Sequence, residues 1–177
     1  DRKTSGILLF SKQKENVSVF QELFTSDNIE KKYWGIVRGF SAPNGKIDSP
    51  VKNPDTKTYK DALTYFETLS SIQLDIPVHP YPQSRYSLIE LTPKTGRMHQ
   101  LRIHLNKISH PLVGDYKYGD RFHNRMYENE FDCHNLFLHA IQLSFTHPFT
   151  KEDLTLKASL NQNWKLIFER FGWGNFT

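Results

Sequence analysis

Apolar residues recur along this chain with two periods, and each period predicts a different kind of element. A helical spacing that begins at Val17 and continues through Phe20, Leu23 and Phe24 predicts an amphipathic helix over about residues 14–27. Near the other end of the chain, the same spacing predicts a terminal helix from the positions of Trp164, Ile167, Phe168 and Phe171.

Short apolar or aromatic runs, bounded by turn-forming residues, predict β-strands elsewhere in the chain. They cover residues 7–10, 32–38, 62–69, 86–92, 136–145 and 154–158. Prolines and an Asn-Gly pair favour a loop or hairpin over 41–57, and three prolines favour an irregular connection over 75–84. Residues 115–134 are interpreted as a long polar insertion with aromatic residues. The pattern predicts one domain of mixed α and β structure over residues 1–177.

The segment LTPKTGRMHQLRIH, which runs from residue 91 to 104, combines a turn signal with a dense group of basic and histidine side chains. Thr95 is the expected N-cap of a helix of about three turns that follows a strand. Arg102 lies about 60–80° from the centre of the apolar stripe of this helix, so we expect it to be half-buried and to reach into a cleft. The stripe that should face the core consists of Met98, Leu101, Leu105 and Ile108.

Positive charge is concentrated in one part of the chain. The sequence has 23 Lys and Arg against 19 Asp and Glu, which gives a net charge of +4. Residues 94–125 hold seven Lys and Arg and two Asp, so the rest of the chain is close to neutral. A local basic surface is the expected footprint of a polyanion site, although a solvated charged face gives the same pattern.

Several kinds of chemistry lack support in the sequence. The single cysteine, Cys133, excludes a disulfide framework and suits a reducing compartment. No apolar run approaches the ~18 residues of a membrane span, so we expect no membrane partner. HExxH and paired cysteines are absent, and His99 and His104 would project about 140° apart on a helix, so we expect no metal. A Cys–His nucleophile has no supporting signature, whereas paired catalytic carboxylates are neither marked nor excluded.

Five motifs occur in order along the chain, namely DRKTSG, KKYWGIVRG, LTPKTGRMHQLRIH, HPLVGDYKYGD and LFLHAIQLSFTHPF. Together with the 32-residue step from Asp1 to Tyr33, they resemble the RluA-type family of pseudouridine synthases. The stretches RYSLIELTPKTGR and YGDRFHNR and the THPFT…W…FGW ending are similar to the tRNA pseudouridine synthase C branch of that family. That branch acts on uridine 65 in the acceptor–T-stem region of tRNA.

The resemblance implies an α+β fold with a mixed, mostly antiparallel central sheet and flanking helices. It implies an isomerase that breaks the bond between uracil and ribose, rotates the base and rejoins it through carbon, without a cofactor. Asp1 matches the family's catalytic aspartate, and Arg102 matches the arginine that orients this carboxylate and favours its charged form. Tyr33 matches the tyrosine that packs on the target uracil, and its neighbour Trp34 should point to the other face of the strand and belong to the core.

An RNA substrate brings further expectations. A base inside a folded stem must be extruded before it can react, and positive side chains near the pocket must hold the backbone phosphates. The expected RNA-binding residues are Arg2, Lys94, Arg97 and His99. We expect tRNA as the partner, a monomeric protein and a cytoplasmic location.

In the resembled family, the aspartate follows a His-Arg-Leu sequence that is absent here. We therefore expect this chain to be the C-terminal major part of a catalytic domain, with the fold incomplete at its N-terminus and the activity of the bare chain lost. Two alternatives to a tRNA enzyme stay within RNA biology: a synthase acting on ribosomal RNA, and a catalytically silent RNA-binding relative or fragment. A hydrolytic metalloenzyme on the His-rich surface is the third.

Overall fold

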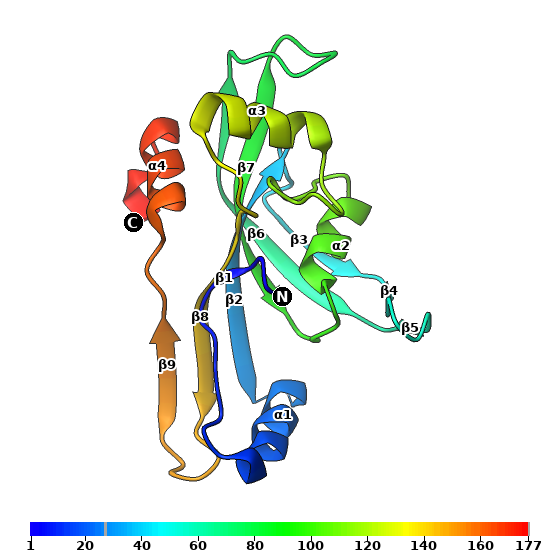
Figure 1. The fold of residues 1–177 in the computed structure, drawn as a ribbon, viewed down its shortest axis with the longest axis vertical. Helices are drawn as coiled ribbons and strands as arrows, with labels where there is room; N and C mark the ends of the chain where they lie inside the picture. Colours follow the sequence, from blue (N-terminus) through cyan, green and yellow to red (C-terminus); the bar gives the residue numbers. More distant parts are fainter. Residues whose placement is uncertain (27, 177) are drawn as a thin grey trace.

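The computed structural model describes residues 1–26 and 28–176 and has an α+β fold built on one large sheet (Figure 1). The strands follow the order β1-β8-β2-β7-β6-β3 across the sheet, and β9 pairs with β8. Among the described strands, β1 and β8 pair in parallel and every other pair is antiparallel, as expected. The seven strands of this sheet are β1 (Ser5–Gly6), β2 (Ile29–Arg38), β3 (Asn44–Asp48), β6 (Leu63–Leu74), β7 (Ser84–Pro93), β8 (Leu138–Thr146) and β9 (Asp153–Lys157).

Helices surround the sheet at its ends and on its faces (Figure 1). In this view α3 crosses the top, α2 lies to the right, α4 to the left and α1 at the bottom. A two-stranded hairpin of β4 (Val51–Lys52) and β5 (Tyr59–Lys60) projects beyond α2. The helices are α1 (Val17–Thr25), α2 (Gln100–Lys107), α3 (Arg121–Phe131) and α4 (Gln162–Phe171), with short 3-10 helices at Lys14–Asn16 and Gly174–Phe176.

Two hydrophobic clusters pack on opposite faces of the sheet. The alternation of side chains along β2 sends Trp34 into a cluster with α3 and α4, and Tyr33 into a cluster with α2. This confirms the expected opposite orientation of the two aromatic residues. The first cluster is rich in aromatic rings, and the Trp164 ring makes edge contacts with Phe137 and Phe168. The face of the sheet that carries Tyr33 is therefore the face on which α2 packs and on which the pocket described below lies.

Most predicted elements are present, although several of their bounds differ from the prediction. Predicted strands at 32–38, 62–69, 86–92, 136–145 and 154–158 correspond to β2, β6, β7, β8 and β9. The predicted terminal helix corresponds to α4, and the connection at 75–84 is irregular between β6 and β7. The helix predicted over about 14–27 corresponds to the first 3-10 helix and α1, and its position 27 lies outside the described residues. Residues 41–57 are more ordered than expected, because β3 joins the main sheet by pairing with β6.

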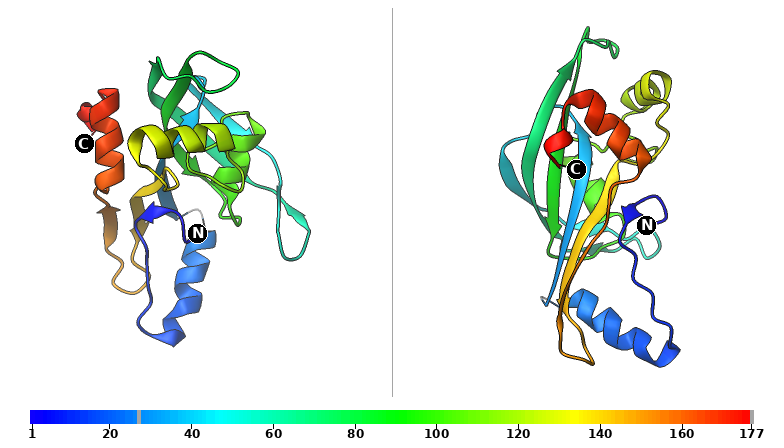
Figure 2. Two further views of the ribbon diagram at one scale, coloured as in Figure 1. Left: turned by 45° about the horizontal axis from the view of Figure 1, so that its top comes forward. Right: turned by 90° about the vertical axis from the view of Figure 1, so that its left-hand side faces the viewer.

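The predictions for two segments, 7–10 and 115–134, are wrong. Residues 7–10 do not form a buried strand: β1 ends at Gly6, and Leu8 and Phe10 are 73% and 78% exposed. The reason is that β9 pairs with β8 from Gln142 onward, so this edge of the sheet is already occupied. Figure 2 shows the N-terminal segment leaving the sheet after β1 and running to α1.

The segment 115–134 is also not a polar insertion. It contains α3, whose N-cap Asp120 accepts hydrogen bonds from the backbone N–H groups of Phe122 and His123. Tyr127 and Phe131 of α3 are buried in the first cluster. The helix was missed because its polar residues outnumber its apolar ones, and only the fold shows which face is covered.

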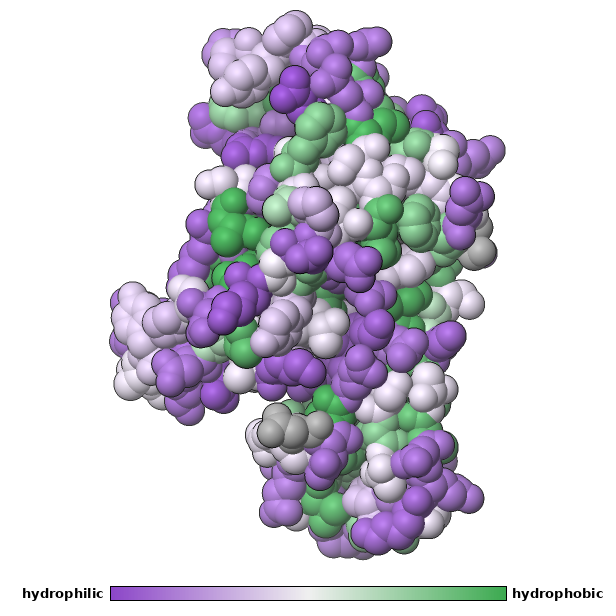
Figure 3. Space-filling view, turned by 180° about the vertical axis from the view of Figure 1, so that it is seen from behind, coloured by the Kyte–Doolittle hydropathy of each residue, from purple (hydrophilic) through white to green (hydrophobic). Residues whose placement is uncertain are grey.

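The surface seen from behind is mostly hydrophilic to neutral, with hydrophobic residues in separate patches (Figure 3). No helix in the described part of the chain combines the length and the apolar character needed to cross a membrane.

We expect Trp164→Ala to lower the free energy of unfolding by about 3–5 kcal/mol, because it leaves a large void between α4 and the sheet. Its neighbour Lys165 is exposed, so Lys165→Ala should change stability by less than about 0.5 kcal/mol. Urea denaturation of the two variants measures both values. Equal losses in the two variants would contradict the packing described for α4.

Candidate active site

The position of Asp1 depends on the short parallel pairing of β1 with β8. Ser5 and Gly6 lie opposite His139 and Ala140, and Ser5 Oγ lies 2.8 Å from His139 Nδ1. Gly6 has φ +98°, and a Cβ there would lie 2.3 Å from the carbonyl oxygen of Ala140. Only glycine permits this close approach. The pairing therefore holds the chain from which Asp1 extends toward α2.

The opposite wall of the site is the start of α2, and its geometry differs from the expected one. The N-cap is His99 rather than Thr95, and the helix has eight residues. Thr95 Oγ1 instead donates a hydrogen bond to Oε1 of the buried Gln100, which also accepts from the backbone N–H of Arg97. These side-chain hydrogen bonds hold residues 95–99 in a turn, so the helix begins only at Gln100. Met98, expected in the core, is consequently 50% exposed, whereas Leu101 and Leu105 are buried as predicted.

Arg102 binds two carboxylates at once. Its Nη1 donates to Asp1 Oδ2 at 2.7 Å, which is the contact expected between these two residues. Its Nε and Nη2 donate to the two oxygens of Asp115, each at 2.7 Å. The side chain of Arg102 is 4% exposed rather than half-buried. It is buried more deeply than helix geometry predicts because a second carboxylate, not anticipated from the sequence, compensates its charge.

Asp115 belongs to the turn before α3 and is 1% exposed. Burial by itself would raise the pKa of Asp115, but hydrogen bonds from Arg102 and from the backbone N–H groups of Tyr118 and Lys117 outweigh it and lower the pKa. The Tyr118 ring lies 5.1 Å from the guanidinium carbon of Arg102. Residues 115–118 therefore hold Arg102 through an ion pair with Asp115 and a cation–π contact with the ring of Tyr118.

His99 lies beside the same carboxylate, in a backbone conformation that few residues adopt. It has φ +55°, its Nδ1 is 3.1 Å from Tyr118 Oη, and its Nε2 is 3.9 Å from Asp1 Oδ2. Burial, followed by the positive charges of Arg102 and Lys117, lowers the pKa of His99, so its ring is neutral at pH 7. A neutral His99 adds no positive charge next to Asp1.

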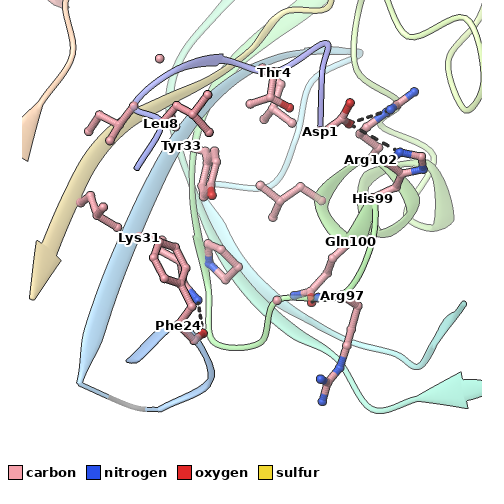
Figure 4. A pocket seen from close by; sticks show the side chains of 18 of the residues that line it. Asp1, Thr4, Leu8, Phe24, Lys31, Tyr33, Arg97, His99, Gln100 and Arg102 are labelled. Atoms are coloured by element: carbon pink, nitrogen blue, oxygen red, sulfur yellow. Dashed lines mark hydrogen bonds and ion pairs between the residues drawn. The ribbon is translucent and has the colours of Figure 1, made fainter. Parts of the chain in front are cut away.

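These residues line one end of a pocket with a volume of about 790 Å³. Figure 4 shows Asp1, Arg102 and His99 on one side, Lys31, Phe24 and Leu8 on the other, and Tyr33 between them. Tyr33 faces the cavity, and burial raises the pKa of its phenol, which therefore stays protonated at neutral pH. The structure thus brings every predicted site residue to one cavity: Asp1, Tyr33, Arg102, Arg2, Lys94, Arg97 and His99.

The predicted RNA-binding side chains differ in how firmly they are held. Arg2, Lys94 and Arg97 are exposed at the pocket rim, and Arg97 Nε donates to the carbonyl oxygen of Asp61 at 3.0 Å.

Within residues 1–26 and 28–176, no group of three or more His, Cys, Asp or Glu is arranged to hold a metal ion.

Sequence reasoning missed four residues of the site. Asp115 and Tyr118 lie in the motif HPLVGDYKYGD, and Gln100 lies in LTPKTGRMHQLRIH. The motifs therefore marked these residues, but the sequence did not indicate which contacts they make. Lys31 lines the pocket two residues before Tyr33, and the alternation of side chains along a strand could have indicated this shared face.

Comparisons with known proteins agree with the geometry. A family model described as RNA pseudouridylate synthase matches residues 1–107. The tRNA pseudouridine synthase C of Haemophilus ducreyi is 41% identical over 182 residues, which cover 98% of this chain and 75% of the relative. That of Vibrio parahaemolyticus is 40% identical over 183 residues, which cover 98% of this chain and 74% of the relative.

Two solved human structures share the fold. Human RNA Pseudouridylate Synthase Domain Containing 1 superposes with a TM-score of 0.69 at 24% identity, over 90% of this chain and 66% of that one. Human RNA Pseudouridylate Synthase Domain Containing 4 superposes with a TM-score of 0.68 at 26% identity, over 90% of this chain and 69% of that one. This chain therefore spans about two thirds of the length of either structure.

We expect Asp115→Asn to lower the free energy of unfolding at pH 7 by about 3 kcal/mol, because Arg102 would stay buried without its bidentate partner. The sign of the pH dependence follows from the lowered pKa of Asp115. The stabilisation is fully present above the pKa of the unfolded chain, near 3.9, and is lost as the pH falls through the lower folded value.

The difference between the wild-type protein and Asp115→Asn should therefore shrink below about pH 4. Urea denaturation between pH 3 and 7 measures it, with the exposed Asp55→Asn as the control variant. A difference that stays constant down to pH 3 would show that the charge of Asp115 is not what stabilises Arg102.

Proposed function

Because this chain belongs to the RluA-type RNA pseudouridylate synthase family, a family of isomerases, we propose that it converts uridine 65 of tRNA to pseudouridine in the pocket around Asp1. The observation that carries the proposal is the ion pair of Asp1 with the buried Arg102, at one end of a cavity that also contains an aromatic ring and several cations. The choice of tRNA follows the names of the similar tRNA pseudouridine synthase C proteins. The same proposal places the reaction in the cytoplasm.

The reaction breaks the bond from ribose to a uracil nitrogen and forms a bond from ribose to a uracil carbon. The proton of that carbon leaves and a proton is gained at the nitrogen, so no oxidant or reductant is consumed. In our proposal, Asp1 acts as the nucleophile or as the charge stabiliser when the first bond breaks. Its Oδ1 accepts a hydrogen bond from the backbone N–H of Lys3 and its Oδ2 accepts one from Arg102, and together these bonds fix the orientation of the carboxylate.

Tyr33 would supply the surface on which the extruded uracil stacks. An aromatic ring in this place compensates part of the stacking that the base loses when it leaves the RNA helix. Because the phenol stays protonated, its hydroxyl can donate a hydrogen bond to the rotating base. Arg2, Lys94 and Arg97 at the rim would contact backbone phosphates.

In the full-length protein, we expect Asp1→Asn to reduce tritium release from tRNA that carries tritium on the uracil carbon to near background, because the neutral amide can neither attack nor stabilise positive charge. Its affinity for tRNA should stay within about threefold of the wild-type value, since phosphate contacts dominate binding. The exposed Asp75→Asn serves as the matched control and should keep full activity. Unchanged pseudouridine formation by Asp1→Asn would remove this residue from the mechanism.

The target nucleotide is tested in cells with and without the gene. We expect pseudouridine to be lost at position 65 of tRNA and retained elsewhere, as measured by chemical mapping of tRNA and ribosomal RNA. Loss of pseudouridine only in ribosomal RNA would show that ribosomal RNA, and not tRNA, is the substrate. Loss of pseudouridine at no site would favour the alternative of a catalytically silent RNA-binding protein.

A further inference from the structure

The pocket extends well beyond the residues assigned to the reaction. Its volume of about 790 Å³ lies near the upper end of the roughly 300–1,000 Å³ typical of small-molecule sites, so a single extruded base leaves much of it empty. The far part is formed by the N-terminal segment, α1, β2 and β8, through Leu8, Phe24, Lys31 and Leu143. Figure 4 shows this part separated from Asp1 by Tyr33.

Lys31 is a buried cation without a counter-charge among the described residues. The residue is 7% exposed and lines the pocket. Its Nζ donates a long hydrogen bond of 3.5 Å to the carbonyl oxygen of Phe24 and lies 6.0 Å from the centre of the Phe24 ring. Among the described residues, no carboxylate lies within ion-pair distance of it. A buried ammonium in this state costs free energy that a bound anion would recover.

The surroundings of Lys31 add positive charge. Burial and, after it, the charge of Lys94 lower the pKa of Lys31, so the two ammonium groups lie close enough to repel each other. Among the described residues that line the pocket, five are Lys or Arg and one carries a carboxylate. That carboxylate, on Asp1, is bound to Arg102 at the opposite end. Because Arg2, Lys94 and Arg97 are exposed to solvent, Lys31 is the buried cation of the described lining whose charge lacks compensation.

We propose that Lys31 binds a phosphodiester of the RNA strand next to the target uridine, with Phe24 as the apolar surface under the adjoining nucleoside. This inference rests on the proposed function and names a second subsite of the same pocket. Lys31 and Tyr33 are two residues apart on one strand and both face the cavity, so their backbones are roughly 7 Å apart. A base stacked on Tyr33 would thus carry its neighbouring phosphate toward Lys31.

A matched pair of variants tests the proposal. Lys31→Met removes the buried charge and keeps an unbranched apolar side chain in its place. Lys32→Met removes the adjacent charge, which lies on the same strand but pairs with Glu90 at 2.8 Å and does not line the pocket. Both variants change the net charge of the protein equally, so any difference between them reports on the position of the charge.

We expect Lys31→Met to weaken the binding of a tRNA transcript about tenfold or more, as measured by fluorescence anisotropy. The slope of log affinity against log salt should fall by roughly 0.7–0.9, which is the value for one phosphate contact. KM should rise more than kcat falls. Lys32→Met should leave the affinity and the slope unchanged, and Lys31→Arg should restore most of both because it keeps the charge.

Thermal unfolding of each variant confirms that it is folded, and Lys31→Gln replaces Lys31→Met if the latter does not fold. Equal affinities and salt slopes for Lys31→Met and Lys32→Met would overturn the phosphate subsite. This outcome is separate from failure of the proposed function, which would appear as absence of tritium release by the full-length wild-type protein.

Discussion

The site depends on the burial of one guanidinium between two carboxylates. Arg102 is 4% exposed, and this burial is tolerable only because Asp115 binds it with two hydrogen bonds and Asp1 with a third. The three residues come from the N-terminal segment, α2 and the turn before α3. Their mutual attraction therefore joins segments about a hundred residues apart in sequence, and a change in any of the three alters the site as a whole.

The charge balance of this group explains how Asp1 can remain reactive. One guanidinium is shared between two carboxylates, and a neutral His99 beside Asp1 adds no further positive charge. Asp115 takes the larger share of the hydrogen bonds of Arg102. Asp1 is thus oriented without being fully neutralised. At the opposite end of the pocket, the ammonium of Lys31 is buried without a counter-charge among the described residues. In the proposed function, the carboxylate of Asp1 serves the chemistry at one end of the cavity and Lys31 binds the RNA backbone at the other.

Elements with a strong period were predictable because local pattern and tertiary burial agree in them. Strands β2 and β7 and helix α4 follow their apolar residues closely. The failures have identifiable causes. The run at 7–10 has the composition of a strand but finds no free sheet edge, because β9 occupies it. The start of α2 was misplaced because Gln100 and Thr95 hydrogen-bond each other, which no propensity reveals.

Sequence patterns were enough to predict the α+β class, most elements and, through five ordered motifs, the family. The motifs also indicated which residues share the pocket, because a motif identifies a residue's chemical role without requiring its position in space to be known. The folded chain was needed to show how deeply Arg102 is buried, that Asp115 compensates its charge, and that Lys31 shares the cavity of Tyr33 without a counter-charge among the described residues. Burial and electrostatic compensation could not be predicted, because they depend on groups brought together from distant segments. A single sequence records each group but not the distances between them.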